Sequence, residues 1–256
     1  MSGHSKWANI KHQKGAADAK RGRIFTKLIR EMTVAVREGG PNPEANFKLR
    51  LAIQKARDNN MPLDHIERTI KRASGAEEGA ALIEMVLEGY GPGGTAIMVQ
   101  ATTDNRNRTV QDIRSLFTKY GGNLGETGCV SWLFENKGVI TVKTDSMNQD
   151  DLMLNAIDAG AEDVQPAGPG FVEIYTKPEE LEKVKAALEA KKIIIERAEV
   201  SLQPKQMVQL DEKAALTTLK LLDKLEEHDD VQSVASNADF SDAVLEKYQL
   251  EASSGR

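Results

Sequence analysis

The chain has 256 residues but only one cysteine, Cys129, which excludes an intramolecular disulfide. A lone thiol is typical of proteins in a reducing compartment, so we expect a cytoplasmic protein. No apolar run approaches the roughly 20 residues that a membrane helix needs. The N-terminal positive charges are not followed by the apolar segment of a secretory signal. We therefore expect no membrane partner.

Residue groups that carry catalysis or bind metals are also scarce. The four histidines are His4, His12, His65 and His228, and none has metal-ligand spacing to another histidine, the cysteine or clustered carboxylates. Cys129 lies beside an apolar segment and is expected to be a small core residue. The glycine-rich segment 91–94 lacks the ending of a phosphate-binding P-loop, which favours a hairpin turn. We predict no catalytic residue, metal, cofactor or small-molecule substrate, and hence no enzyme.

Charge, by contrast, is plentiful and unevenly distributed. Residues 1–75 hold 16 basic and 7 acidic side chains, a net charge of +9, whereas the rest holds 18 basic and 32 acidic ones, a net charge of −14. The first thirty residues contain a single acid, Asp18. An acidic protein with a basic end is suited to binding a polyanion through that end.

The basic end supplies the candidate nucleic-acid contacts. Lysine and arginine neutralise phosphates independently of base sequence, and an aromatic ring such as that of Trp7 can stack on an unpaired base. The alternative is a solvated basic face without a ligand. The pattern does not distinguish DNA from RNA. The candidate residues are Lys6, Trp7, Lys11, His12, Lys14, Lys20, Arg21, Arg23, Lys27 and Arg30.

A second candidate site is the polar segment Asp104–Thr109, between a predicted strand and a predicted helix. Free N–H groups at a helix N-terminus attract anions, so Arg106 and Arg108 are candidate phosphate-binding residues. The alternative is that Asn105 or Asn107 caps the helix and the arginines pair with nearby acids. The sequence does not decide between the two.

Apolar spacing predicts three helices in the basic part. Apolar residues from Ile24 to Val36 follow helical periodicity, and Gly39–Gly40 provides a stop. Asn42 and Pro43 are expected to start a second helix, and Pro62 a third. The link from Gly39 to Pro43 is the one candidate for the turn of a helix-turn-helix.

Beyond a linker at 77–81, the period changes to that of strands. Residues 82–134 indicate two strands, a helix and a strand at Val130–Phe134. Residues 135–204 then follow the β-α-β-β-α-β order of a split βαβ unit. Elements after 204, ending in a strand at 231–236, are expected to complete the earlier α/β unit, and residues 241–256 to be frayed.

The predicted fold class is therefore α+β. An N-terminal helical bundle precedes two small α/β domains, at least one of them ferredoxin-like. The predicted domains are 1–76, basic, helical and nucleic-acid-binding; 82–134 plus 205–240, α/β; and 135–204, an inserted ferredoxin-like domain.

Several motifs in order resemble those of the YebC/PmpR family, which includes the mitochondrial translational activator of cytochrome oxidase subunit one. They lie at 3–12, 20–22, 25–28, 89–94, 104–109 and 128–134, and the resemblance extends to about residue 240. The resemblance implies a three-domain cytoplasmic protein without known catalytic residues. Bacterial members are usually described as DNA-binding transcriptional regulators, and other members act in translation at the ribosome.

The resulting hypothesis is a nucleic-acid-binding regulator of gene expression, and more narrowly a DNA-binding transcriptional regulator. The alternative is a ribosome- or RNA-associated translation factor that assists synthesis of difficult sequences. The expected partner is duplex DNA or ribosomal RNA, with the ribosome a candidate partner in the second case.

Overall fold

The computed structural model describes residues 7, 18–75, 81–144, 149–168 and 170–254. The chain divides into two compact units. The first unit comprises Gly15–Val130 and Thr217–Val234. The second comprises Met1–Lys14, Ser131–Leu216 and Ala235–Arg256.

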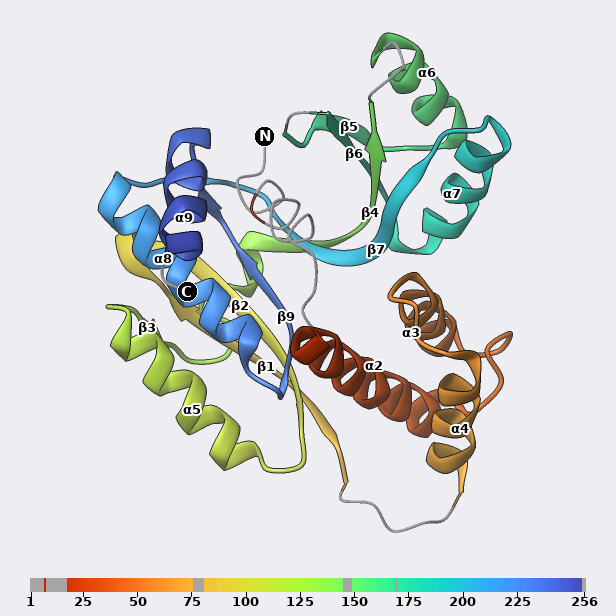
Figure 1. The fold of residues 1–256 in the computed structure, drawn as a ribbon, viewed down its shortest axis with the longest axis horizontal. Helices are drawn as coiled ribbons and strands as arrows, with labels where there is room; N and C mark the ends of the chain where they lie inside the picture. The colour runs from red at the N-terminus through yellow and green to blue at the C-terminus, as the bar shows by residue number, and fades with distance from the viewer. Residues whose placement is uncertain (1–6, 8–17, 76–80, 145–148, 169, 255–256) are drawn as a thin grey trace. The chain divides into compact units, whose positions relative to one another are not determined.

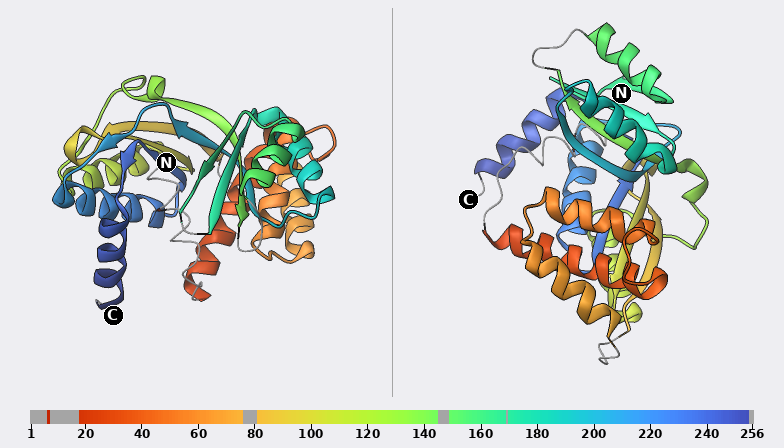
Figure 2. Two further views of the ribbon diagram at one scale, coloured as in Figure 1. Left: turned by 90° about the horizontal axis from the view of Figure 1, so that it is seen from above. Right: turned by 90° about the vertical axis from the view of Figure 1, so that its right-hand side faces the viewer.

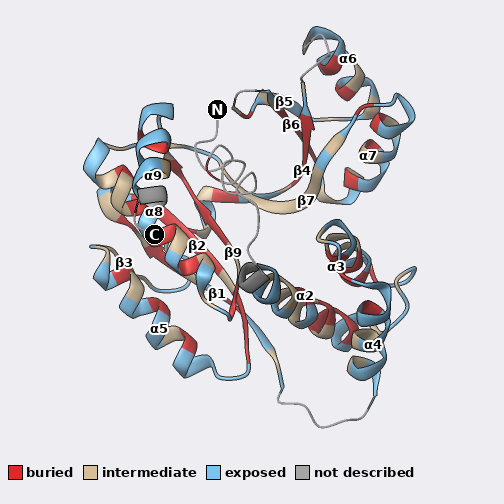
Figure 3. Ribbon diagram, viewed as in Figure 1, coloured by how far each residue is buried: buried red, intermediate tan, exposed pale blue. Residues whose placement is uncertain are grey.

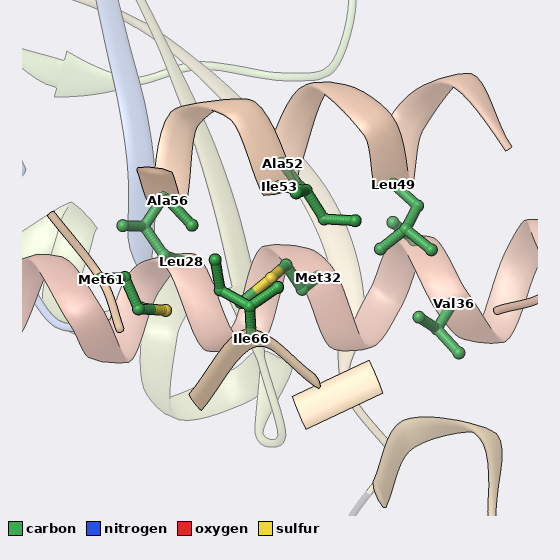
Figure 4. Close-up of a cluster of buried hydrophobic side chains, with 10 residues drawn as sticks. Leu28, Met32, Val36, Leu49, Ala52, Ile53, Ala56, Met61 and Ile66 are labelled. Carbon is green, nitrogen blue, oxygen red and sulfur yellow. The ribbon is translucent and has the colours of Figure 1, made fainter. Parts of the chain in front are cut away.

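Three helices open the first unit: α2 (Asp18–Gly39), α3 (Phe47–Asp58) and α4 (Leu63–Ser74). Helices α3 and α4 each pack against α2. Ten buried side chains form their shared core, including Leu28 and Met32 of α2, Leu49 of α3 and Ile66 of α4 (Figure 4). These apolar residues recur at three- and four-residue spacing, which confirms the predicted helical bundle.

The second helix starts four residues later than the sequence indicates. Asn46, not Asn42, is its N-cap, and its side-chain oxygen accepts from the Leu49 N–H at 3.0 Å. The Asn46 amide also donates to the carbonyls of Ala35 (2.7 Å) and Gly40 (2.8 Å). Asn42 instead accepts from the Glu44 N–H within the turn. The prediction at Asn42 was wrong because the buried Asn46 forms hydrogen bonds both at the end of α2 and at the start of α3.

A four-stranded sheet completes the first unit (Figure 1). Its order is β3-β1-β2-β9, with β1 (Ile83–Tyr90) antiparallel to β2 (Ala96–Thr103). The edge strands are β3 (Asn123–Leu124) and β9 (Val231–Ser236). Helix α5 (Arg106–Lys119) and the C-terminal part of α8 (Glu212–Glu227) lie on the same face of the sheet (Figures 1 and 2).

One sequence expectation about local structure is confirmed in this region and one was wrong. The loop 91–94 is a short 3-10 turn, η1 (Pro92–Gly94), in which Gly93 and Gly94 adopt positive φ angles. It still connects β1 and β2 as a hairpin. Of the strand predicted at Val130–Phe134, residues 131–133 instead form a 3-10 turn, η2 (Ser131–Leu133), and only Phe134 belongs to a strand.

The second unit contains a second four-stranded sheet, in the order β5-β6-β4-β7. All its neighbouring strands are antiparallel. This order is that of a split βαβ unit, so the ferredoxin-like prediction is confirmed. The elements in chain order are β4 (Phe134–Lys143), α6 (Gln149–Ala159), β5 (Asp163–Pro166), β6 (Phe171–Thr176), η3 (Pro178–Glu180), α7 (Leu181–Ala190) and β7 (Ile195–Pro204).

The rest of the second unit is a short parallel pair and a helix. Strand β8 (Val208–Gln209) pairs with β10 (Ala238–Asp239). Helix α9 (Asp242–Ser254) occupies the segment expected to be frayed. It forms because Val244 and Leu245, with the preceding Phe240, are buried, although most of the segment is polar.

The fold is α+β, with N-terminal helices followed by α/β parts, as predicted. Strand β9 joins the first sheet although the second sheet intervenes in the chain, which is the order expected for an inserted unit. The predicted domain boundaries themselves stay a prediction. None of the helices in the described part of the chain is long and apolar enough to cross a membrane.

Candidate nucleic-acid interface

The candidate contacts of the basic end fall into three groups. Lys6, Lys11, His12 and Lys14 lie outside the described residues, as does the side chain of Lys20. Arg21 and Arg23 are exposed near the start of α2. Lys27 and Arg30, one and two turns further along, are only partly exposed.

Trp7 is 2% exposed. Its ring would have to leave this buried position before it could stack on a base.

Lys27 and Arg30 bind the end of α8 and the loop that follows it. The Lys27 ammonium donates to the carbonyl of Glu226 at 2.5 Å, in the last turn of α8, where the helix dipole favours a cation. Arg30 donates to the carbonyl of Asp229 at 2.8 Å and to the carboxylate of Asp230 at 2.7 Å. These two cations therefore have partners within the first unit, whereas Arg21 and Arg23 are exposed nearer the N-terminus of α2.

Asp230 is the centre of this network. One carboxylate oxygen accepts from Arg30, and the other accepts from Arg108 at 3.0 Å and from the Thr109 hydroxyl at 2.7 Å. Thr103 lies 3.2 Å from the same second oxygen. The Asp230 side chain is only 4% exposed. One buried carboxylate thus joins α2, the end of β2 and the first turn of α5.

The hydrogen bonds control the ionisation of Asp230. Burial alone would raise the pKa of this carboxyl, but hydrogen bonds from Thr109, Arg108 and Arg30 outweigh burial and lower the pKa from 3.8 to about 2. The carboxylate is therefore ionised at neutral pH, and both arginines are held by a full negative charge.

The two candidate phosphate-binding arginines differ in their surroundings. Arg108 pairs with Asp104 at 2.9 Å as well as with Asp230. Asn105 caps α5 by accepting from the Arg108 N–H at 3.1 Å. The surroundings of Arg108 therefore fit the alternative in which an asparagine caps the helix and the arginine pairs with nearby acids. Arg106 is exposed and forms no ion pair with any residue in the described ranges.

Two other sequence motifs, at 89–94 and 128–134, meet around Glu88. Its carboxylate accepts from the backbone N–H groups of Gly128 (2.8 Å) and Val130 (2.9 Å). The Tyr90 hydroxyl donates to the carbonyl of Cys129 at 2.9 Å. Burial, and then the charge of Glu88, raise the pKa of the Cys129 thiol. These contacts give the motifs a structural role and leave Cys129 un-ionised at neutral pH.

The described residues include no cluster of histidine, cysteine and carboxylate side chains that could hold a metal ion. His228 lies 3.4 Å from Asp112, and His65 is exposed on α4.

The candidate helix-turn-helix link does not have the required length. Residues 40–46 separate α2 from α3, whereas that motif joins its helices by three or four residues. The Gly39–Pro43 link was therefore a wrong candidate, because the helix starts at Phe47 and not after Pro43.

Together, the fold and surface define an α+β protein with a basic helical start and a ferredoxin-like unit. The description "TACO1/YebC protein N-terminal domain" matches residues 5–76, and "TACO1/YebC second and third domain" matches residues 82–238. The chain belongs to the TACO1/YebC family.

Individual relatives match along almost their whole length. A "probable transcriptional regulatory protein" of Dehalococcoides mccartyi is 59% identical, over 98% of this chain and 100% of the relative. One of the same description from Persephonella marina is 54% identical, over 96% of this chain and 99% of the relative. The crystal structure of the conserved hypothetical protein Aq1575 from Aquifex aeolicus is 52% identical and superposes with a TM-score of 0.80, covering 88% of this chain and 93% of that one.

Proposed function

We propose that the protein is a DNA-binding transcriptional regulator of the cytoplasm whose basic N-terminal part contacts the phosphates. The observation that carries the proposal is the run of eight lysines and arginines within the first thirty residues, against one acid. The names of the relatives, probable transcriptional regulatory proteins, support the regulatory role.

The contacts of Lys27 and Arg30 support a smaller proposed contact surface on α2. Lys27 and Arg30 are held by Glu226, Asp229 and Asp230, so they are poor candidates for phosphate contacts. Arg21 and Arg23 remain exposed. The proposed interface therefore comprises these two arginines together with the lysines that precede them in the sequence.

We also propose the domain division 1–76, 82–134 plus 205–240, and 135–204. The placement of β9 in the first sheet supports the interruption, and the family matches at 5–76 and 82–238 support the first boundary.

Selection from a random duplex library tests the function. The full-length protein is incubated with random 30-base-pair duplexes over several rounds, and affinity for the selected duplex is compared with that for an unselected duplex and for an RNA hairpin. A transcriptional regulator should prefer the selected duplex by about 10³-fold or more. A preference below about tenfold, with RNA bound more tightly than either duplex, contradicts the proposal and favours the RNA alternative.

A further inference from the structure

The outer face of α5 carries a basic stripe, defined as residues 106–107, 110–111, 114–115 and 118–119. These four adjacent pairs follow helical periodicity and so lie along one side of the helix. All are exposed except Val110, which is half-buried. The exposed side of α5 is pale blue in Figure 3. The stripe contains Arg106, Arg114 and Lys119, and no carboxylate.

The absence of acids from the stripe is unusual for this chain. Residues 76–256 contain 32 acids against 18 basic residues. The single acid in α5, Asp112, lies off the stripe, beside His228. A solvated helix face normally mixes both signs of charge, so a row of cations alone favours an anionic ligand.

Two of the three cations of the stripe have no ion-pair partner among the described residues. Neither Arg106 nor Arg114 forms an ion pair or side-chain hydrogen bond with any residue in the part of the chain that the structure describes. The Lys119 ammonium lies 5.8 Å from the centroid of the Tyr120 ring and leaves its charge exposed.

The opposite side of α5 fixes the helix firmly. Thr109, Ile113 and Phe117 are fully buried against the sheet side. The Asn105 cap and the Arg108–Asp230 ion pair hold the first turn. The backbone that carries the stripe is therefore held in place, and little backbone order would be lost when a ligand binds.

The spacing fits a nucleic-acid backbone. At about 1.5 Å per residue, the three cations span about 20 Å, with intervals of roughly 12 and 7.5 Å. Each strand of a duplex carries one phosphate per about 3.4 Å of helix axis, so a row parallel to the axis spans about six base-pair steps. Asparagine, glutamine, serine and threonine between the cations add neutral donors to phosphate or sugar oxygens.

We propose that this stripe is a second nucleic-acid contact, which binds the phosphodiester backbone independently of base sequence. It rests on the proposed function for the class of ligand but uses different residues from the N-terminal contact. The chemistry is shared by DNA and RNA, so both are tested.

The test measures affinity for a random 30-base-pair DNA duplex and for a 30-base-pair RNA duplex, from 0.05 to 0.3 M salt. The stripe variant is R106Q/R114Q/K119Q in the full-length protein. The matched control, K177Q/K183Q/K192Q, removes the same charge from exposed positions of the ferredoxin-like unit.

For DNA, the stripe variant should show a slope of log affinity against log salt that is shallower by about two to three units. Its affinity at 0.1 M salt should be lower by about tenfold or more than that of the control. A larger loss on one duplex identifies the preferred nucleic acid.

Equal slopes and affinities within about twofold for the stripe and control variants, on both duplexes, would overturn the inference. Should the triple variant unfold, R114Q alone should lose about one unit of slope, and no loss would again overturn it. A third variant, R21Q/R23Q, separates the two proposals. If R21Q/R23Q loses affinity and the stripe variant does not, the stripe proposal is rejected and the N-terminal contact is retained. Loss in the stripe variant alone supports the stripe and moves the main contact away from α2.

Discussion

Arg30 and Asp230 form an ion pair with an N–O distance of 2.7 Å, although 200 positions separate them in the chain. The same carboxylate binds Arg108 and Thr109 at the start of α5. Arg108 and Thr109 belong to the segment 104–109, which the sequence suggests as a phosphate site. In the structure they donate instead to the buried carboxylate of Asp230. The ion pair fixes α2 to the sheet of the first unit, with the exposed Arg21 and Arg23 at its outer end.

Replacement of Asp230 should destabilise the protein. D230N keeps the size of the side chain but removes the charge that faces two arginines, and it replaces one acceptor oxygen by a donor. Loss of one member of such a network typically costs about 2–4 kcal/mol. Urea unfolding at pH 7 measures the change.

The neighbouring residue provides the control for this substitution. Asp229 is exposed, and only its backbone carbonyl accepts from Arg30. D229N should therefore change the free energy of unfolding by no more than about 0.5 kcal/mol. Equal effects of D229N and D230N would show that the buried network does not stabilise the fold.

The stabilisation from Asp230 should depend on pH. Its pKa is lowered from 3.8 to about 2 in the folded state, so the ionised form stabilises the fold fully above pH 3.8. The benefit decreases as the pH falls from 3.8 toward 2, because the unfolded chain then binds the proton more readily. The difference in unfolding free energy between wild type and D230N should thus be constant from pH 7 to 5 and smaller at pH 3. A difference that grows on acidification contradicts this assignment.

Two glycine-to-alanine substitutions should have opposite effects. At Gly89 an added Cβ would lie 2.6 Å from the carbonyl of Asn123 and 2.8 Å from the Phe117 ring. G89A should therefore destabilise the protein by about 1–3 kcal/mol. At Gly22, inside α2, nothing lies within 4 Å, so G22A should stabilise it by about 0.5–1 kcal/mol. Thermal unfolding of both variants tests the pair, and a destabilising G22A would indicate that α2 does not extend through this position.

Periodicity in the sequence predicts much of the fold. The apolar spacing from Ile24 to Val36 indicates the buried face of α2, and the alternation after residue 134 indicates the order of the ferredoxin-like unit. Both are local patterns, and the spacing of apolar residues in the sequence matches the geometry of the helix or strand that forms. The start of α3 could not be predicted in this way, because Asn46 is selected as its cap by contacts with Ala35 and Gly40.

The residues of the candidate site could be predicted less well from the sequence than the fold. Lys27 and Arg30 lie in the same charged pattern as Arg21 and Arg23, and charge alone does not show that Lys27 and Arg30 bind the end of α8 and the loop after it. Those partners lie about 200 positions away, at the end of α8 and in the acidic residues before β9. Local spacing carries no information on such a distant contact. The carboxylate-free stripe of α5, in contrast, is visible in the sequence once the helix boundaries are known.

The central claim is that Arg21 and Arg23, near the N-terminus of α2, bind nucleic acid and that Lys27 and Arg30 do not. The salt dependence of DNA binding tests this claim most directly. R21Q/R23Q and K27Q/R30Q remove the same charge from the same helix. Binding of a random 30-base-pair duplex is measured for both between 0.05 and 0.3 M salt, at a temperature where both are folded. The account predicts that R21Q/R23Q lowers the slope of log affinity against log salt by about two units, while K27Q/R30Q retains the wild-type slope and is less stable to urea. A wild-type slope for R21Q/R23Q together with a reduced slope for K27Q/R30Q would contradict it.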